Sequence, residues 1–384
     1  MPAKQTSKKR VAKKGVAKKG VVKKQSAKTR TVTPVRGQIK SEGTPPGAAS
    51  DTRGAAADIP VGPTSVELNI RGRSVTLTNL AKVFWPEAGI TKGDLLRYYA
   101  AIAPVLLPHL ADRAMVMKRY PNGATGPYFF MKRTPTPHPT WLRQCAIEHG
   151  SGSVIDFPVI DDLAALLWVV NLGCIDLNPW YARCDDVDRP DCLYMDLDPG
   201  GGVPFANVRE AALLVRDGLA ADGLPSYAKT TGSRGIHIAV PIVRGPLQKD
   251  VWTYAKAFAL RLADSAPRLL TAVYRVADRP RGRVLVDYNQ NAWGRTLASI
   301  YSARPTPSAT VSTPITWREI EQGVDMQAFR IDNVPARVRK LGDLWAPILA
   351  RTGRVKLPEI AETKSGALHR ALSLTPGRRA GRAR

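Results

Sequence analysis

Hydrophobic and polar residues alternate in several short segments, and alternation with a period of two predicts β-strands. Val66, Leu68 and Ile70 alternate with polar residues. The pattern resumes at Val75 after an Arg-Gly pair, which predicts a hairpin turn at residues 71–72. Further strands are predicted at residues 115–118, 128–132, 174–177, 193–197, 226–229, 236–242 and 284–288.

Other segments repeat their hydrophobic residues at helical spacing. Leu95, Tyr99 and Ile102 share one face, and Thr91 precedes them as a candidate N-cap, so a helix is predicted over residues 91–103. Further helices are predicted over residues 161–172, 204–221, 248–264 and 335–350. Strands and helices do not alternate regularly, so we expect an α+β fold with antiparallel hairpins.

Charge is distributed unevenly along the chain. The 384 residues carry 57 Lys and Arg against 32 Asp and Glu, a net charge of +25. Residues 1–60 hold 15 of the basic residues and 3 of the acidic ones, and Val-Ala-Lys-Lys-Gly occurs twice within them, at 11–15 and 16–20. We therefore expect a disordered Lys-rich tail and linker at 1–63, a folded domain at 64–356 and a basic tail at 357–384. The first tail is interpreted as an arm that contacts DNA phosphates, or as a solubilising segment.

Composition also narrows the class of protein. No stretch approaches 18 uninterrupted apolar residues, so no membrane span is expected. The basic N-terminus lacks the apolar segment of a secretory signal. The four cysteines form no CxxC pair, which favours reduced thiols over a zinc site. The excess of positive charge favours a nucleic-acid partner.

Two carboxylates alternate at the end of one predicted strand. In Tyr194-Met-Asp-Leu-Asp-Pro-Gly200, Asp196 and Asp198 should project together while Met195 and Leu197 enter the core. Two like charges at this distance favour a divalent cation between them. The alternative is an acidic loop at a strand end without a metal.

A glycine-rich link joins two later predicted strands. In Thr230-Thr-Gly-Ser-Arg-Gly-Ile-His237, the hydroxyls of Thr231 and Ser233 and the guanidinium of Arg234 could bind phosphate oxygens. His237 alternates with isoleucines, so it should point toward the same site. The alternative for His237 is a purely structural role.

A third carboxylate lies within a hydrophobic strand. Burial of Asp287 requires a partner, which is either a metal shared with Asp196 and Asp198 or one of the arginines at 279, 281 and 283. Arg295 and Arg304 follow as candidates for binding a triphosphate. Three carboxylates, a hydroxyl-rich link and arginines together indicate two-metal phosphoryl transfer.

The order of these motifs resembles a known family. DLDPG, TTGSRGIH and VLVDYNQN resemble the three motifs of the archaeo-eukaryotic primase superfamily, and most closely the polymerase domain of bacterial DNA ligase D. The resemblance covers residues 66–320. It implies a primase-polymerase fold, in which a mixed, largely antiparallel sheet forms the catalytic core between helices.

The resemblance also implies roles for individual residues. Asp196, Asp198 and Asp287 match the metal ligands and catalytic carboxylates, and Lys82 and Lys92 match a pair that binds a DNA 5′-phosphate. Residues that match the nucleotide site are Lys118, Phe129, Phe130, Thr231, Ser233, Arg234, His237 and Arg304. One of the two phenylalanines could instead belong to the core. Asn178 departs from the family, which usually has His there, and an amide cannot carry that charge.

The activity implied is addition of nucleotides to 3′-hydroxyl primers during gap filling in non-homologous end joining. The family implies two Mn²⁺ or Mg²⁺ ions, a preference for ribonucleotides, gapped DNA as substrate, and partnership with Ku and a separate ATP-dependent ligase. No Lys-x-Asp-Gly adenylation motif is found, so we expect a stand-alone polymerase in the bacterial cytoplasm, near the nucleoid. The alternatives are a primase that starts strands de novo and a catalytically weak protein that binds DNA ends.

Overall fold

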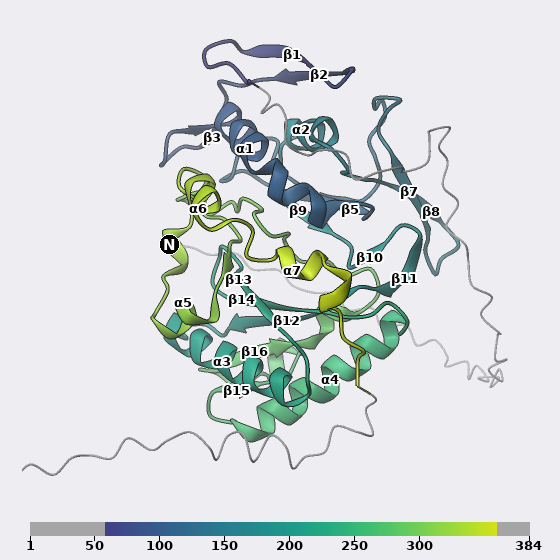
Figure 1. The fold of residues 1–384 in the computed structure, drawn as a ribbon. Coiled ribbons are helices and arrows are strands. Elements are labelled where there is room, and N and C mark those ends of the chain that lie inside the picture. Colours follow the sequence, from purple (N-terminus) through teal and green to yellow (C-terminus); the bar gives the residue numbers. More distant parts are fainter. Residues whose placement is uncertain (1–57, 359–384) are drawn as a thin grey trace, which may run out of the picture. The chain divides into compact units, whose positions relative to one another are not determined.

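The computed structural model describes residues 58–358 (Figure 1). The predictions for the Lys-rich tail before residue 58 and for the basic tail after residue 358 lie outside the described residues. The first strand begins at Ser65, close to the predicted start of the folded domain.

The first half of the described chain combines hairpins, two helices and a small sheet. β1 (Ser65–Ile70) and β2 (Arg73–Thr78) form the predicted hairpin, whose turn residues Arg71 and Gly72 both have positive φ. The helices are α1 (Lys92–Leu110) and α2 (Leu163–Asn171). β5 (Met115–Arg119) lies between β6 (Phe129–Met131) and β9 (Cys174–Pro179) in a three-stranded antiparallel sheet. Three further hairpins are β3–β4 (Val83–Trp85, Ile90–Thr91), β7–β8 (Gln144–Glu148, Val154–Pro158) and β10–β11 (Ala182–Arg183, Asp186–Pro190).

The second half is organised around a six-stranded sheet in the order β15-β16-β12-β14-β13-β17. Its strands are β12 (Cys192–Pro199), β13 (Tyr227–Thr230), β14 (Ile236–Pro241), β15 (Leu270–Thr271), β16 (Val284–Asp287) and β17 (Pro314–Ile315). Every neighbouring pair is antiparallel except β15 and β16, so the predicted mixed, largely antiparallel sheet is confirmed. Helices α3 (Phe205–Ala221) and α4 (Gln248–Ser265) pack against β12 and are drawn below the sheet in Figure 1.

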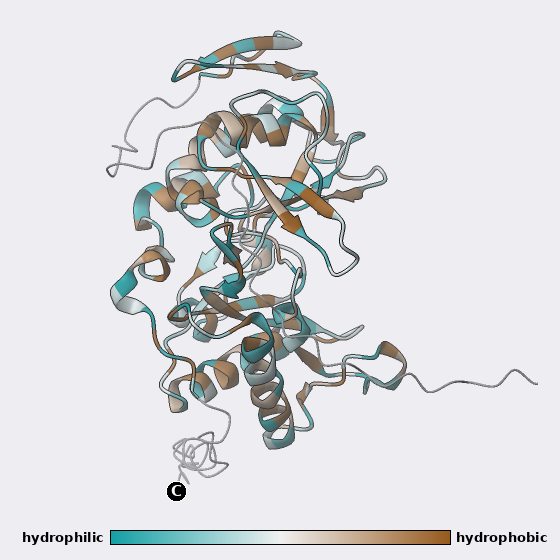
Figure 2. Cartoon of the chain, turned by 90° about the vertical axis from the view of Figure 1, so that its right-hand side faces the viewer, coloured by the Kyte–Doolittle hydropathy of each residue, from teal (hydrophilic) through white to brown (hydrophobic). Residues whose placement is uncertain are grey.

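Hydrophobic side chains of both halves share one large core cluster. Leu95, Tyr99 and Ile102 of α1 are fully buried, as their spacing predicted. Met195 and Leu197 are likewise fully buried, while the aspartates between and beyond them are not. Hydrophobic and hydrophilic residues are both present along most of the helices (Figure 2). The four cysteines are unpaired and buried. None of the described helices is long and apolar enough to cross a membrane.

Two helix predictions were wrong at their ends. Residue 103 was the expected end of α1, yet the helix continues through Pro104 and Pro108 to Leu110, because Leu106 and Leu110 are fully buried. The helix predicted over 335–350 is divided into α6 (Val334–Leu341) and α7 (Ala346–Leu349). Gly342 separates them with a φ of 70°, a conformation that glycine adopts without strain.

The last described residues contact β13 and the end of β14 in the large sheet. The indole nitrogen of Trp345 donates to the carbonyl of Ala228 on β13 at 3.0 Å. Val355 forms a parallel bridge with Ile242, directly after β14. The short helices α5 (Trp317–Glu321), η1 (Val276–Asp278), η2 (Tyr288–Asn291), η3 (Met326–Ala328) and η4 (Arg351–Gly353) complete the described elements.

Candidate active site

Four side chains form a row across four adjacent strands of the large sheet. Asp196 on β12 is in register with His237 on β14 and with Asp287 on β16. His237 is in turn in register with Lys229 on β13. Directly opposed residues of antiparallel strands project from the same face, so the row Lys229–His237–Asp196–Asp287 lies on one side of the sheet. Asp198 lies two residues beyond Asp196 and projects from the same face.

A cavity of about 300 Å³ opens over this part of the sheet. Most of the predicted nucleotide residues line it, together with Asp196 and Asp198; Arg295 does not. The lining residues are Lys118, Phe130, Asp176, Asn178, Asp196, Leu197, Asp198, Thr231, Ser233, Arg234, Gly235, His237, Gln290, Thr296, Leu297, Ala298 and Arg304. Asp176 and Gln290 were not predicted.

The three predicted metal ligands lack full compensation of their charge. Burial raises the pKa of Asp196 to about 6, against the opposing effect of Lys229 and Arg304. Burial and the charge of Asp196 also raise the pKa of both Asp198 and Asp287. The side-chain oxygens of Asp287 accept hydrogen bonds from the backbone of Asn289 and from the side chain of Gln290, both at 2.9 Å. The carboxylate of Asp287 is therefore held by these two hydrogen bonds rather than by an ion pair with an arginine.

Lys229 is a buried cation that the sequence analysis missed. Its side chain is 1% exposed, and its Nζ contacts His237 Nδ1 at 2.7 Å, the carbonyl of Ala298 at 2.9 Å and Ser312 Oγ at 2.5 Å. His237 Nε2 lies 3.3 Å from Asp196 Oδ1. Burial, Lys229 and Arg304 hold the pKa of His237 well below its usual value, so the imidazole is neutral at pH 7.

The glycine-rich link is folded around a hydroxyl group. Thr231 Oγ1 accepts hydrogen bonds from the backbone N–H groups of Ser233, Arg234 and Gly235 at 3.1–3.2 Å. These three N–H groups are therefore satisfied within the link, and the hydroxyl of Thr231 serves to fold the link. The exposed guanidinium of Arg234 lies 3.7 Å from Asp198 Oδ1.

Two glycines of this link allow it to pack closely against its neighbours, one against β12 and the other against Arg304. A Cβ atom on Gly235 would lie 2.1 Å from the carbonyl oxygen of Leu197, between the two aspartates of β12. A Cβ atom on Gly232 would lie 2.6 Å from Cγ of Arg304, and the φ of this glycine is +65°. No side chain fits at either position without movement of the neighbouring segment.

Asp176 joins the two basic residues on the other side of the cavity. It is 1% exposed, and its carboxylate lies 3.2 Å from Lys118 Nζ and 3.5 Å from Arg304 Nε. Lys118 also faces the rings of Tyr128 and Phe130, with Nζ 4.1 and 5.7 Å from the ring centres. In the segment Cys174–Pro179, the sequence analysis assigned a possible site role only to Asn178 and none to Asp176.

The two phenylalanines of β6 are both exposed. Phe129 and Phe130 are 42% and 59% exposed, so the alternative that one of them belongs to the core is wrong. Phe130 lines the cavity, whereas Phe129 contacts the guanidinium of Arg119 at 5.3 Å from the ring centre. Exposed aromatic rings beside a cavity can stack on bases.

Asn178 lines the cavity but its amide is used locally. Its Nδ2 donates to the carbonyl of Asp176 at 3.1 Å, and the side chain is buried. The position usually occupied by His in the resembling family therefore carries no positive charge here.

Lys82 and Lys92 lie close together at the start of α1. The β3–β4 pair holds them there, and the backbone N–H of Lys92 donates to the carbonyl of Lys82 at 2.8 Å. Burial, with the charges of Lys82 and Arg119, lowers the pKa of Lys92 to about 8. Both ammonium groups are engaged within the fold: Lys92 is 4% exposed and its Nζ donates to the carbonyl of Thr78 at 2.7 Å, and Lys82 Nζ donates to the carbonyl of Pro121 at 2.7 Å.

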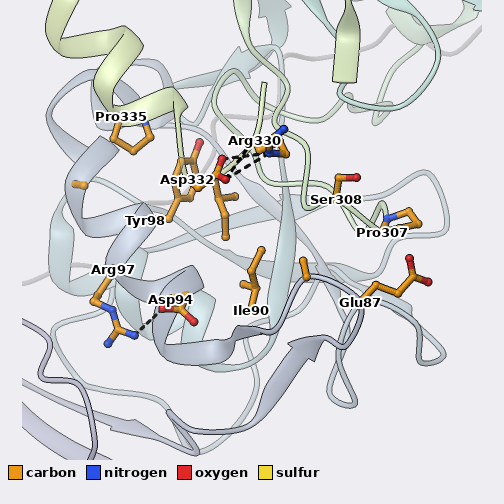
Figure 3. Close-up of a pocket in the computed structure, with 13 residues that line it drawn as sticks. Glu87, Ile90, Asp94, Arg97, Tyr98, Pro307, Ser308, Arg330, Asp332 and Pro335 are labelled. Atoms are coloured by element: carbon orange, nitrogen blue, oxygen red, sulfur yellow. Dashed lines mark hydrogen bonds and ion pairs between the residues drawn. The ribbon is translucent and has the colours of Figure 1, made fainter. Parts of the chain in front are cut away.

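A larger cavity of about 760 Å³ lies elsewhere, between α1 and the loops around residues 307 and 331 (Figure 3). Four of its five charged groups pair with one another, Arg97 with Asp94 at 2.8 Å and Arg330 with Asp332 at 3.3 Å; the fifth is Glu87. None of the predicted site residues lines it. We therefore place the candidate active site in the smaller cavity, which Asp196 and Asp198 line; Asp287 does not line it but is in register with Asp196.

The donor set fits a hard divalent cation, because such ions prefer carboxylate oxygens. The raised pKa of all three aspartates shows that their negative charge would be stabilised by a cation. Within residues 58–358, no three His, Cys, Asp or Glu side chains converge closely enough to hold a metal ion as they stand. Binding would therefore require the side chains of Asp198 and Asp287 to rotate toward Asp196.

Comparison with known proteins identifies similar sequences. The chain is 35% identical over 296 residues to the multifunctional non-homologous end joining DNA repair protein LigD of Mycobacterium tuberculosis (strain ATCC 25618 / H37Rv), covering 73% of this chain and 39% of that protein. It is 29% identical over 271 residues to the bifunctional non-homologous end joining protein LigD of Bacillus subtilis (strain 168), covering 69% and 42%. The chain thus spans about two fifths of the length of these relatives.

A solved structure and a family model agree with these relatives. The polymerase domain from Mycobacterium tuberculosis ligase D, solved in complex with DNA, matches with a TM-score of 0.68 and 34% identity, covering 72% of this chain and 98% of that one. This likeness confirms the primase-polymerase fold predicted from the order of the motifs. The family model of the LigD primase-polymerase domain matches residues 91–345, which include all three aspartates, and the chain belongs to this family.

Proposed function

We propose that this protein is a nucleotidyltransferase that adds nucleotides to the 3′-hydroxyl of a primer at a DNA end or gap. The row of Lys229, His237, Asp196 and Asp287 carries this proposal, because its two central members line the cavity and the outer two are in register with them. It places carboxylates beside Arg234 and Arg304, so a nucleoside triphosphate could be bound at one end by cations and reach the acidic residues at the other. The solved relative's complex with DNA supports a nucleic-acid substrate.

In the proposed reaction the primer 3′-oxygen attacks the α-phosphorus of the triphosphate. A new P–O bond forms, the bond to pyrophosphate breaks, and the 3′-hydroxyl proton is released. Asp196, Asp198 and Asp287 would hold two divalent ions, Mn²⁺ or Mg²⁺. When bound, these ions would favour the ionised 3′-oxygen and offset the charge of the leaving pyrophosphate.

The remaining residues orient the substrates. Arg304 and Lys118 would bind the triphosphate from one side of the cavity and Arg234 from the other, because guanidinium groups match phosphate oxygens. Ser233 and the imidazole of His237 would add hydrogen bonds, whereas Thr231 would act by fixing the link. Phe130 would stack on a base in the cavity, and Phe129, which projects from the other face of β6, would contact a base outside it.

The pair of Lys82 and Lys92 would bind the 5′-phosphate on the far side of a gap. A dianionic phosphate would restore the charge that Lys92 tends to lose, since bringing an anion close raises the pKa of a lysine. We extend the proposal to gap filling in non-homologous end joining with preference for ribonucleotides, and to partnership with Ku and a separate ATP-dependent ligase. This extension follows from the family and from the names of the relatives.

One observation favours a second candidate, a protein that binds DNA ends with little catalysis. Asn178 donates only to a backbone carbonyl and offers the nucleotide no charge where the family usually has His. The loss of one cation beside the triphosphate would weaken catalysis more than DNA binding.

Primer extension on a gapped duplex with a 5′-phosphate separates the two candidates. We expect extension with Mn²⁺ and NTP, less with dNTP, and none from an Asp196→Ala/Asp198→Ala double variant. A 5′-hydroxyl gap, or the Lys82→Ala/Lys92→Ala variant, should lower gap affinity while leaving the chemistry on a simple primer–template intact. Tight gap binding by an inert wild-type protein would instead establish the second candidate.

A further inference from the structure

Lys229 makes three polar contacts, and for two of them the neighbouring groups determine which atom donates the proton. Ser312 Oγ lies 2.8 Å from the carbonyl of Thr230, to which its only proton is donated. Ser312 must therefore accept from Lys229 at 2.5 Å, and the carbonyl of Ala298 can only accept. Two of the three ammonium protons are thus committed to oxygen atoms.

The third contact is with the imidazole of His237. Nζ of Lys229 lies 2.7 Å from Nδ1, so one of the two nitrogens carries the shared proton. Burial and the charge of Arg304 lower the pKa of Lys229 well below its ordinary value, so basicity alone does not decide which nitrogen carries this proton. With the proton on Lys229, Nδ1 is an acceptor, and a neutral His237 carries its own proton on Nε2.

The other side of the imidazole is consistent with this assignment. Nε2 lies 3.3 Å from Asp196 Oδ1, and a carboxylate oxygen requires a donor opposite it. If Nδ1 held the proton, a lone pair on Nε2 would face a lone pair on Asp196. The N–H groups therefore point in one direction along the row, from Lys229 to His237 and from His237 toward Asp196.

We infer that Lys229 is a positioning residue: its ammonium holds His237 in the tautomer with a proton on Nε2, so that the imidazole presents a hydrogen-bond donor to the cavity. In the free protein this donor faces Asp196. With a triphosphate bound, the same N–H would serve an anionic phosphate oxygen, a consequence that rests on the proposed function. The tautomer itself does not rest on it.

Lys229 is also suited to this task by its burial. At 1% exposed it cannot reach solvent or a substrate, so it acts only through its three partners. The register of β13 against β14 fixes it opposite His237, and the contact with Ala298 ties the row to the loop that lines the cavity. A lysine elsewhere on the strand would face the opposite side or another partner.

The tautomer can be measured directly by long-range ¹H–¹⁵N correlation spectra of the full chain labelled with ¹⁵N at histidine. His237 is assigned by comparison with His237→Gln, since the chain has only five histidines. At pH 7.5 without metal, we expect Nε2 protonated and Nδ1 unprotonated but hydrogen-bonded. Lys229→Met should move the Nδ1 resonance, whereas Lys249→Met, an exposed lysine of α4, should not.

Kinetics then test the consequence for nucleotide use. Lys229→Met should lower kcat/KM for the nucleotide about 10- to 100-fold, the worth of one hydrogen bond to a charged group, with KM for the primer–template unchanged. In the His237→Gln background the same change should alter kcat/KM less than about 2-fold, because the lysine acts through the imidazole. Lys229→Arg, which keeps N–H donors, should recover part of the loss. Thermal unfolding reports whether each variant is folded.

The outcomes separate this inference from the proposed function. A proton on Nδ1 of wild-type His237, or on both ring nitrogens, would overturn the inference without need of any variant. Equal losses from Lys229→Met in the wild-type and His237→Gln backgrounds would likewise overturn the positioning role. If the wild type shows the expected tautomer but no polymerisation, the proposed function fails and the assignment of the hydrogen bonds stands.

Discussion

The carboxylate of Asp176 lies between Lys118 and Arg304 with almost no access to water. Its removal would leave two cations facing each other beside the cavity, and breaking a buried charge pair is costly. We predict that Asp176→Asn lowers the free energy of unfolding by about 3 kcal/mol, measured by urea denaturation. The matched control is Asp278→Asn, whose exposed partner Arg275 is 3.7 Å away and whose loss should change stability by less than about 0.5 kcal/mol. Equal effects of the two changes would contradict this role.

Asp196 gives the metal-free protein a particular dependence on pH. Its pKa in the fold is about 6, above the ordinary value of 3.8, so folding favours the protonated acid. The contribution of Asp196 to stability is therefore fully present below about pH 4 and is lost as the pH rises through 6. At pH 7 the loss amounts to about 3 kcal/mol, at 1.36 kcal/mol per pKa unit.

We predict that Asp196→Asn removes this part of the pH dependence. Urea denaturation between pH 4 and 7 with a chelator present should show the variant gaining stability relative to the wild type as the pH rises. Added Mn²⁺ should raise the melting temperature of the wild type and leave that of the variant nearly unchanged, because a ligand stabilises only the protein that binds it. Parallel pH profiles for the two proteins, or equal stabilisation by Mn²⁺, would argue against a charged, metal-ready site.

At this scale the sequence revealed the residues whose role follows from spacing alone. Asp196 and Asp198 alternate within one strand, and Asp287 is conspicuous among valines and leucine, so their common face could be predicted. Lys229 could not, because a lysine is ordinarily exposed, and only the pairing of β13 with β14 shows that it is buried against His237. The same holds for Asp176, whose partners come from β5 and from the loop after Ser302.

The element that depends most on a close approach is the link between β13 and β14. Gly235 passes so near Leu197 that a methyl group would overlap its carbonyl oxygen. We predict that Gly235→Ala pushes the link away from β12, costs about 1–3 kcal/mol of stability and lowers nucleotide addition at least 10-fold. Gly201→Ala, in the loop after β12 with no atom within 4 Å of the added Cβ, is the matched control and should behave like the wild type. An active, stable Gly235→Ala protein would mean that the link tolerates displacement.

The predicted elements were reliable where a periodic pattern was long and undivided. The strands carrying the aspartates, the hairpin at Gly72 and the helix after Thr91 all form as expected. The end of α1 was predicted too early. Local sequence rules treat two prolines as helix breakers, but burial of the last turn in the tertiary structure outweighs their effect. The β7–β8 hairpin was not predicted, because its residues alternate only weakly and its stability comes from packing around Phe157 and Trp180.

For the whole molecule, the order of three motifs indicated the family, and the family model and solved relative then confirmed it. The strand order β16-β12-β14-β13 could not be derived from periodicity, since hydrophobic patterns say which face is buried and not which strand is the neighbour. That order is what brings Lys229, His237, Asp196 and Asp287 into one row. The chemistry of the site is therefore a property of the sheet, although each residue is visible in the sequence.

The last prediction concerns the division of charge between the folded domain and the Lys-rich segment before it. Residues 1–60 hold 15 of the 57 basic residues, whereas the carboxylates that define the proposed chemistry all lie far beyond them. Deletion of residues 1–57 should leave single-turnover nucleotide addition on saturating DNA unchanged while lowering DNA affinity. Each lysine that neutralises a phosphate contributes about 0.9 to the slope of log K against log salt concentration, so the loss of five contacts would lower that slope by about 4 to 5.

Binding of a gapped duplex, measured by fluorescence anisotropy at several salt concentrations, gives this slope for the full and shortened chains. A variant with the lysines and arginines of 1–57 replaced by glutamine keeps the length of the segment and should match the deletion, because the effect is one of charge. If the slope stays the same after deletion, the DNA contacts come from the basic surface of the folded domain alone. If nucleotide addition on saturating DNA falls as well, the segment takes part in placing the primer, and the division between binding arm and catalytic domain is wrong.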